Sequence, residues 1–271
     1  FYLPEDMRLL RWVHFLCADV AVSVLAGIFF FSRLIGGKVQ WEVYVLAGAA
    51  TLALYNLDHL WDLRLISDAS ERRRFHQDHR KILMILSVFS FSTAIIVLPF
   101  IGQPYRLPGA LLFVCVAICV LAGRRLRRLR EPAVAAIYTL AVASPGLVNA
   151  RVVPAGMIWL LGLYTIVVYA NTMASSCMDI HEDQVLTPGS ALEMMSLRRH
   201  GWTQGISLAL AFLTGLGALA AGIKVQVVLV VWMIGLVPPV VYHRRAVSQE
   251  WKLRLWLELS LSLGFLAAWL T

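Results

Sequence analysis

The sequence predicts an all-α, polytopic membrane protein with about nine transmembrane helices. Hydrophobic residues make up 59% of the 271 residues and charged residues only 15%, whereas a soluble domain carries roughly 25% charged residues. The charges gather in short clusters between apolar runs, and each run is close to the length of about 20 residues that crosses a bilayer. One large soluble core does not explain a mean hydropathy of +0.73.

The apolar runs place the predicted spans in order along the chain. They cover residues 13–34, 41–61, 82–101, 108–123, 132–149, 154–177, 203–222, 225–242 and 253–270. The first run is too long for the apolar region of a cleavable signal peptide, and none is expected. No composition shift marks a separate soluble domain, so residues 1–271 are expected to form a single transmembrane domain.

The distribution of basic residues predicts the orientation. With the N-terminus in the cytoplasm, 19 of the 24 Lys and Arg fall on the cytoplasmic side, as the positive-inside rule requires. The net charge of +8 is therefore explained by topology and by contact with anionic lipid, and no nucleic-acid partner is expected. We assign the cluster Arg124–Arg130 to this topology signal. The expected location is a bacterial cytoplasmic (inner) membrane, with the N-terminus and the acidic motifs cytoplasmic.

Two acidic pairs lie where the second and sixth predicted spans leave the membrane. Asp58 and Asp62 form one D-x-x-x-D pair at residues 58–62, and Asp179 and Asp183 form another at 179–183. Carboxylates four residues apart share a helix face and repel each other unless a cation bridges them. Magnesium suits such pairs, since it binds one or two carboxylates together with substrate phosphates.

The two pairs repeat at a fixed offset of 121 residues with four spans between them. Both pairs therefore face the same side of the membrane. The offset predicts two related four-helix halves plus a ninth helix, and internal repeats with a site at their interface are common in membrane proteins. Cationic groups near the pairs suit an anionic substrate such as a diphosphate: Arg64, Arg72, Arg73, Lys81, Arg198 and Arg199.

The two acidic motifs in this topology resemble those of the UbiA superfamily of intramembrane prenyltransferases. The resemblance implies a nine-helix bundle whose motifs, after helices 2 and 6, bind Mg²⁺ and the diphosphate of an isoprenoid donor. The family often has Asn four residues before the first Asp of a motif, where this chain has Leu54 and Ser175. Asn56 and Asn171 lie nearby instead, and we include both among the candidate diphosphate-binding residues.

The function implied is a Mg²⁺-dependent prenyltransferase that moves an isoprenoid chain from a prenyl diphosphate to a hydrophobic acceptor. Asp58, Asp62, Asp179 and Asp183 are then both the metal ligands and the catalytic residues. Aromatic faces can stabilise an allylic carbocation, and the candidates are Tyr55, Trp61, Tyr138, Tyr164 and Tyr169.

Two other functions stay open. A non-catalytic UbiA-like protein would bind an isoprenoid or pigment, or serve as a subunit of a larger membrane complex; dispensable motif aspartates would favour it. A transporter is disfavoured because its site usually lies at mid-membrane, whereas these carboxylates lie at one face.

Other polar residues are given structural interpretations. His76 and His79 form an H-x-x-H pair without an obvious third ligand, and a solvated loop is expected there. His14 and Asp19 are five residues apart and do not share a face of one continuous helix, so they are not expected to form a catalytic pair.

Overall fold

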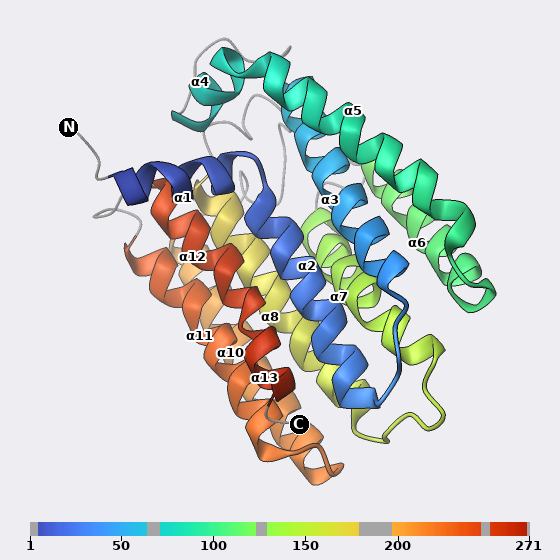
Figure 1. The fold of residues 1–271 in the computed structure, drawn as a ribbon. Coiled ribbons are helices and arrows are strands. Elements are labelled where there is room, and N and C mark those ends of the chain that lie inside the picture. The colour runs from blue at the N-terminus through green and yellow to red at the C-terminus, as the bar shows by residue number, and fades with distance from the viewer. Residues whose placement is uncertain (1–4, 64–70, 123–128, 179–196, 245–249, 270–271) are drawn as a thin grey trace.

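The computed structural model describes residues 5–63, 71–122, 129–178, 197–244 and 250–269, which form helices and no strand. The helices are α1 (Glu5–Phe15), α2 (Ala18–Ile35), α3 (Trp41–Asp62), α4 (Glu71–Asp78), α5 (Arg80–Val97), α6 (Gln103–Ala122), α7 (Arg130–Val148), α8 (Met157–Met178), α10 (Leu197–Ala220), α11 (Val225–Arg244), α12 (Glu250–Ser262) and α13 (Gly264–Trp269). A short 3₁₀-helix, Leu98–Phe100, extends α5. Figure 1 shows them as one elongated bundle.

Each predicted span coincides with a helix, or with two helices in succession, in the described part of the chain. The first span begins later than predicted, at Ala18, because the backbone breaks at Cys17. The last span is divided between α12 and α13. Six of the described helices are long and apolar enough to cross a membrane: α2, α5 with its 3₁₀ extension, α7, α8, α10 and α11. The polar short helices α1 and α4 were not predicted.

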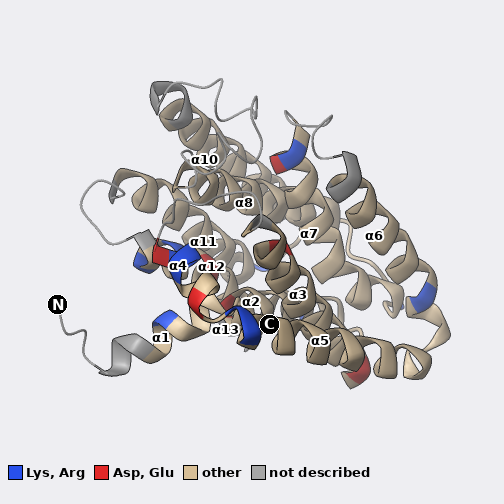
Figure 2. Ribbon diagram, turned by 90° about the horizontal axis from the view of Figure 1, so that it is seen from above, with Lys and Arg blue, Asp and Glu red and all other residues tan. Residues whose placement is uncertain are grey.

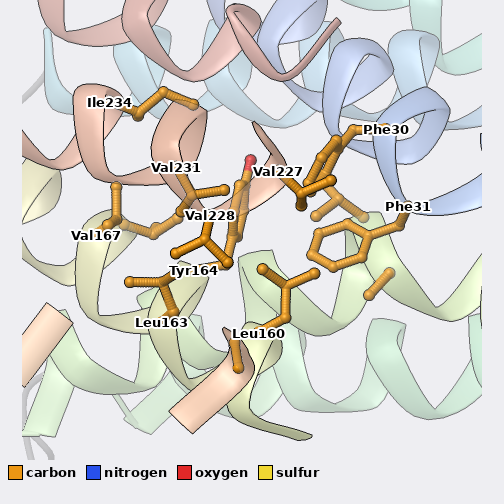
Figure 3. Close-up of a cluster of buried hydrophobic side chains, with 14 of the residues drawn as sticks. Phe30, Phe31, Leu160, Leu163, Tyr164, Val167, Val227, Val228, Val231 and Ile234 are labelled. Carbon is orange, nitrogen blue, oxygen red and sulfur yellow. The ribbon is translucent and has the colours of Figure 1, made fainter. Parts of the chain in front are cut away.

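Helices α2 and α8 form the centre of the bundle. Helix α8 packs against α7, α10, α11 and α12, while α2 packs against α3, α7, α12 and α13. The core between them is largely apolar around Tyr164, whose fully buried ring packs against Phe30 and Phe31 of α2. Val227, Val228, Val231 and Ile234 of α11 close the same cluster, as Figure 3 shows.

Small residues let α2 and α7 approach closely, which is the usual way for helices to pack inside a membrane. A Cβ placed on Gly27 would lie 2.9 Å from Cβ of Val142. A Cβ on Gly146 would lie 3.0 Å from Cα of Ser32, so the two backbones are nearly in contact there.

The outer surface of α5 and α6 is strongly apolar. Ile85, Phe89 and Phe113 are 70%, 69% and 72% exposed, and these two helices lie on the outside of the bundle in Figure 1. Exposing apolar side chains of this kind to water costs free energy, whereas contact with lipid does not. Together with the six long apolar helices, this surface makes the chain an integral membrane protein.

The most extensive helix contacts occur at equivalent places in the two halves. Helix α3 packs against α5, and α8 packs against α10. Helices α3 and α8 correspond to the second and sixth predicted spans, after which the acidic motifs follow. In each half, the two helices with the most extensive contact are therefore those that precede and follow an acidic motif in the sequence.

Candidate functional site

The helix is interrupted between α1 and α2, at residues 15–17. This interruption, called the break below, brings two buried polar side chains together. Cys17 has φ 59°, in the left-handed region that residues other than glycine seldom occupy. The turn carries His14 back toward the first turn of α2, where its Nδ1 lies 2.6 Å from Oδ2 of Asp19. The two side chains were expected on different faces of one continuous helix, and that assumption was wrong because the helix is interrupted at Cys17.

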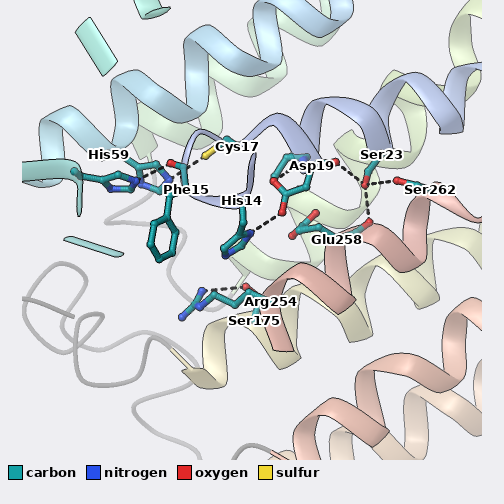
Figure 4. Close-up of polar contacts among 12 residues, drawn as sticks. His14, Phe15, Cys17, Asp19, Ser23, His59, Ser175, Arg254, Glu258 and Ser262 are labelled. Carbon is teal, nitrogen blue, oxygen red and sulfur yellow. Dashed lines mark hydrogen bonds and ion pairs between the residues drawn. The ribbon is translucent and has the colours of Figure 1, made fainter. Parts of the chain in front are cut away.

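Three successive residues of the break are each held by a side chain from α3 or α4. His76 Nε2 donates to the carbonyl of Phe15 over 2.8 Å, and Asn56 Nδ2 donates to the carbonyl of Leu16 over 3.2 Å. The Cys17 thiol lies 3.3 Å from Nε2 of His59. Figure 4 shows the Cys17–His59 contact, which fastens the end of α3 against the break.

His76 is a buried structural residue, and the expectation of a solvated loop was wrong for it. It lies in the short helix α4 with 1% of its surface exposed, and its ring packs 4.4 Å from the His59 ring, centroid to centroid. Burial lowers the pKa of His76 to about 4, with the charges of Arg72 and Arg73 acting in the same direction and the hydrogen bond to Phe15 opposing them.

Positive charge converges on the exposed carboxylate of Asp58, near the end of α3. Arg130 at the start of α7 acts on it, together with Arg72 and Arg73 of α4. Two helices, α4 and α7, therefore bring positive charge to a carboxylate carried by a third helix, α3. Figure 2 shows the charged residues of α4, α7 and α12 on this end of the bundle.

Arg254 links this end of the bundle to α8. It is 4% exposed on α12, and its Nη1 donates to Oγ of Ser175 over 3.4 Å. Its charge also acts on His59 and Glu258. Ser175 lies in the last turn of α8, immediately before the second acidic motif, so Arg254 lies between the ends of the two motif-bearing helices.

Comparison with known proteins identifies the fold. No protein-family model matches the chain, and no curated protein matches it. A solved structure does: the apo form of a UbiA homologue from Aeropyrum pernix K1, with 14% identity and a TM-score of 0.63. The match covers 91% of this chain and 96% of that one. The chain has the UbiA fold.

The UbiA fold confirms the predicted all-α membrane bundle, whereas the count of nine spans stays a prediction. Helices α3 and α8 stand where the resemblance places helices 2 and 6. Asp62 is the last residue of α3, and α8 ends at Met178, one residue before Asp179. The first motif therefore lies at the end of α3, whereas Asp179, Asp183 and Arg64 lie outside the described residues.

The remaining predicted site residues occupy different environments in the UbiA fold. Asp62 ends α3, and Arg198 and Arg199 lie in the first turn of α10, but their side chains are outside the described part of the structure. Lys81 is exposed near the start of α5 and is not among the described cations that act on Asp58. Asn171 is 4% exposed on α8.

Asn56 has no amide hydrogen left for a phosphate. Its Nδ2 donates to the carbonyls of Leu16 and Leu52, at 3.2 and 2.8 Å, and these two bonds use both of its hydrogens. The buried Oδ1 atoms of Asn56 and Asn171 have no hydrogen-bond partner in the described structure. An acceptor oxygen cannot bond another acceptor, so these atoms suit a metal ion or a donor group rather than a phosphate oxygen.

The donor chemistry of this end of the bundle fits magnesium. The Asp58 carboxylate is a hard oxygen donor, which Mg²⁺ prefers over nitrogen and sulfur. Asn56 lies two residues before Asp58 on α3, about 200° around the helix, and it is fully buried whereas Asp58 is exposed, so these two side chains do not share a face. The described residues contain no group of three or more His, Cys, Asp and Glu side chains able to hold a metal. Any such site therefore needs side chains of the two motifs beyond Asp58.

Two residues of the site were not predicted from the sequence. Arg130 was assigned to topology signalling, and Arg254 was counted only among the cytoplasmic charges. Arg254 had a usable signal, since it stands one residue inside the predicted span 253–270 and an arginine there is costly without a partner. Arg130 had none, because it ends a cluster of similar basic residues.

Proposed function

We propose that this protein is a Mg²⁺-dependent prenyltransferase of the UbiA type, which moves an isoprenoid chain from a prenyl diphosphate to a hydrophobic acceptor. The observation that carries the proposal is the convergence of Arg72, Arg73 and Arg130 on Asp58, at the end of the helix that bears the first acidic motif. An isolated carboxylate would repel a diphosphate. A carboxylate that holds a metal ion, with arginines around it, binds one from several sides.

The proposal assigns each predicted residue a role. Asp58, Asp62, Asp179 and Asp183 hold Mg²⁺, and Asn171 is able to add an oxygen ligand through its Oδ1. Phosphate oxygens are bound by the arginines that act on Asp58 and by the other predicted cations of this end, which together are Arg64, Arg72, Arg73, Lys81, Arg130, Arg198, Arg199 and Arg254. Residues 1–271 act as one transmembrane domain in a bacterial cytoplasmic membrane.

Charge compensation by the arginines is the main catalytic contribution of the described residues. When the allylic C–O bond ionises, negative charge moves onto the leaving diphosphate, and a guanidinium held in place stabilises it without reorganisation. Bound Mg²⁺ supplies further neutralisation of the same charge. Arg254 is well placed for this role because it is buried and held by Ser175, so little side-chain entropy is lost on binding.

The distribution of charge supports the proposed orientation. The described charges of α4 and α12 and of the start of α7 lie on the end of the bundle that carries Asp58 (Figure 2). Arg33 ends α2 and Lys224 precedes α11, both at the predicted opposite side. This asymmetry supports a cytoplasmic location for Asp58.

Ligand-dependent unfolding in detergent tests the donor site. A prenyl diphosphate at 100 times its Kd, with Mg²⁺, should stabilise the folded protein by about 2.7 kcal/mol. We expect this shift to be lost in Asp62→Asn and Asp183→Asn. The matched control is Glu42→Gln, a carboxylate in the first turn of α3, at the opposite end of the same helix. A folded wild-type protein that no prenyl diphosphate from C10 to C20 stabilises would contradict the proposal.

The non-catalytic alternative is favoured by one observation. Ser175, which replaces a frequent Asn of the family, is engaged by Arg254 rather than left for a ligand. A protein that binds prenyl diphosphates but releases no diphosphate would be an isoprenoid-binding protein or a subunit of a membrane complex. Measuring diphosphate release beside the thermal shift separates the two functions.

A further inference from the structure

The His14–Asp19 pair is a second polar centre within the bundle, and the metal and diphosphate chemistry does not use it. His14 and Asp19 are 7% and 1% exposed. Asp19 Oδ1 accepts the backbone N–H of Val20, and the residue lies in the first turn of α2.

This arrangement fixes which nitrogen of His14 carries the proton. An ionised carboxylate only accepts hydrogen bonds, so Nδ1 of His14 must donate to Asp19. In the neutral imidazole, Nε2 then has a lone pair. That atom is buried and has no hydrogen-bond partner in the described structure. A histidine oriented by a carboxylate, with its other nitrogen unpaired, is the arrangement that enzymes use for a general base.

The pair adjoins the proposed donor site. Cys17 stands between His14 and Asp19 in the sequence and contacts His59, the neighbour of Asp58. The field of Asp58 and that of Asp19 both reach Cys17. Figure 4 shows the His14 ring extending from the end of α1 toward α12. The charged groups of α12 near the pair are Glu258, which interacts with Asp19, and Arg254.

The break at Cys17 is what makes the pair possible. Residues five apart on a continuous helix do not meet, and a non-glycine residue in the left-handed region is strained. The structure maintains this strained turn with contacts at Phe15, Leu16 and Cys17. Strained backbone that a surrounding structure over-determines is typical of functional sites.

We propose that His14 is the general base that removes the acceptor's proton during prenyl transfer, and that Asp19 positions it. The inference rests on the proposed function. In the step, the allylic C–O bond breaks and its electron pair leaves with the diphosphate. The acceptor oxygen forms a bond to the allylic carbon, and its proton passes to Nε2 of His14. The imidazolium formed is stabilised by Asp19. The test uses phenols as acceptors, because a phenolic hydroxyl, with a pKa of about 10, is acidic enough for an imidazole to take its proton as the new bond forms.

The test is a product ratio, which is insensitive to the fraction of misfolded protein. Wild-type protein in detergent is given Mg²⁺, a prenyl diphosphate that stabilises it, and a panel of membrane-soluble phenols. Prenylated phenol is measured against prenyl alcohol and diene, the products of capture by water and of elimination. We expect His14→Gln and Asp19→Asn to lower this ratio at least about ten-fold, because they lose the base or its orientation.

The controls separate the base from the donor site. Both variants should keep the Mg²⁺-dependent thermal shift with the diphosphate. His79→Gln, a histidine at the same end whose Nδ1 is bonded to the carbonyl of Phe75, should keep the wild-type ratio. Imidazole added to His14→Ala should raise the ratio, whereas it should not in His14→Ala with Asp19→Ala.

Each outcome decides between the hypotheses. A wild-type ratio in His14→Gln would overturn the role of His14. Diphosphate release by the wild type without prenylation of any phenol would overturn the choice of acceptor. Absence of any diphosphate-induced shift in the wild type would instead remove the proposed function, and this inference with it.

Discussion

The Nε2 atom of His76 donates a hydrogen bond to the carbonyl oxygen of Phe15 over 2.8 Å, and this bond joins α4 to the end of α1. The bond satisfies a carbonyl that the helix leaves free where it ends. It also draws an ionisable ring into a buried position between Phe15, Phe75 and His59. The stability of this end of the bundle therefore depends on the protonation state of His76.

We expect the protein to lose stability as the pH falls from 7 to 5. The pKa of His76 is about 4 in the folded state against about 6.5 when unfolded, so the unfolded chain binds more protons in this interval. The stabilising contribution is fully present above pH 6.5 and is lost as the pH falls toward 4. By linkage the loss between pH 7 and 5 is about 2 kcal/mol. Thermal unfolding in detergent across this range measures it.

Other groups also titrate in this interval, so the decisive quantity is the difference between variants. His76→Gln should be less stable at pH 7 but flatter in its pH dependence. His79→Gln should keep the wild-type slope. Equal slopes for the wild type and His76→Gln would show that His76 does not carry the effect.

The close packing of α2 and α7 should be sensitive to a single methyl group. Gly146→Ala places a Cβ 3.0 Å from Cα of Ser32, and because that neighbour is backbone, a helix must shift. We expect a loss of about 1–3 kcal/mol in the free energy of unfolding. Gly162→Ala on α8, where a Cβ meets nothing within 4 Å, is the matched control and should be neutral or stabilising. A neutral Gly146→Ala would contradict the packing described for these helices.

Arg130 should contribute to the binding of the prenyl diphosphate. A hydrogen bond to a charged group is worth about 1.5–3 kcal/mol, so Arg130→Gln should raise the Kd for a prenyl diphosphate about 10- to 150-fold. Arg33→Gln, at the far end of α2, removes one positive charge without touching the site. Titrations of both variants with Mg²⁺ present measure the Kd. An equal, small loss of affinity in both would show that Arg130 acts only through the net charge of the protein.

Asn56 should matter first for stability. Asn56→Ala leaves the carbonyl of Leu16 without its partner, at a cost of about 1–3 kcal/mol. Asn56→Asp keeps an oxygen in place but loses both donated hydrogens, so it should be destabilised as well. If either variant were as stable as the wild type, the fastening of α3 to the break would be unimportant. The diphosphate-induced shift in the same samples reports whether Oδ1 also serves the ligand.

The sequence predicts most of the fold because lipid leaves the backbone few alternatives. Apolar runs of sufficient length must become helices in a bilayer, and the asymmetry of Arg and Lys orders them. The break at Cys17 was not predicted, because no Gly or Pro marks it and the apolar pattern continues through it. Helix α4 escaped it as well, because Glu71–Asp78 is too polar and too short to show a periodic pattern.

The site was predicted in part, and the reason lies in tertiary contacts. Asp58, Arg72 and Arg73 are close in sequence, and the structure brings them together. Arg130 and Arg254 reach the same end from helices that no local pattern connects with α3. His14 and Asp19 form a pair only because Cys17 adopts a left-handed conformation. A cysteine does not indicate that conformation in a sequence, as a glycine would.

The three contacts at Phe15, Leu16 and Cys17 also limit how this end of the protein can move. His76, Asn56 and His59 hold consecutive residues, so α1 cannot swing away from α3 and α4 without breaking all three contacts at once. Moving α1 away from α3 and α4 would therefore cost all three contacts together, which couples the position of α1 to that of α3 and α4.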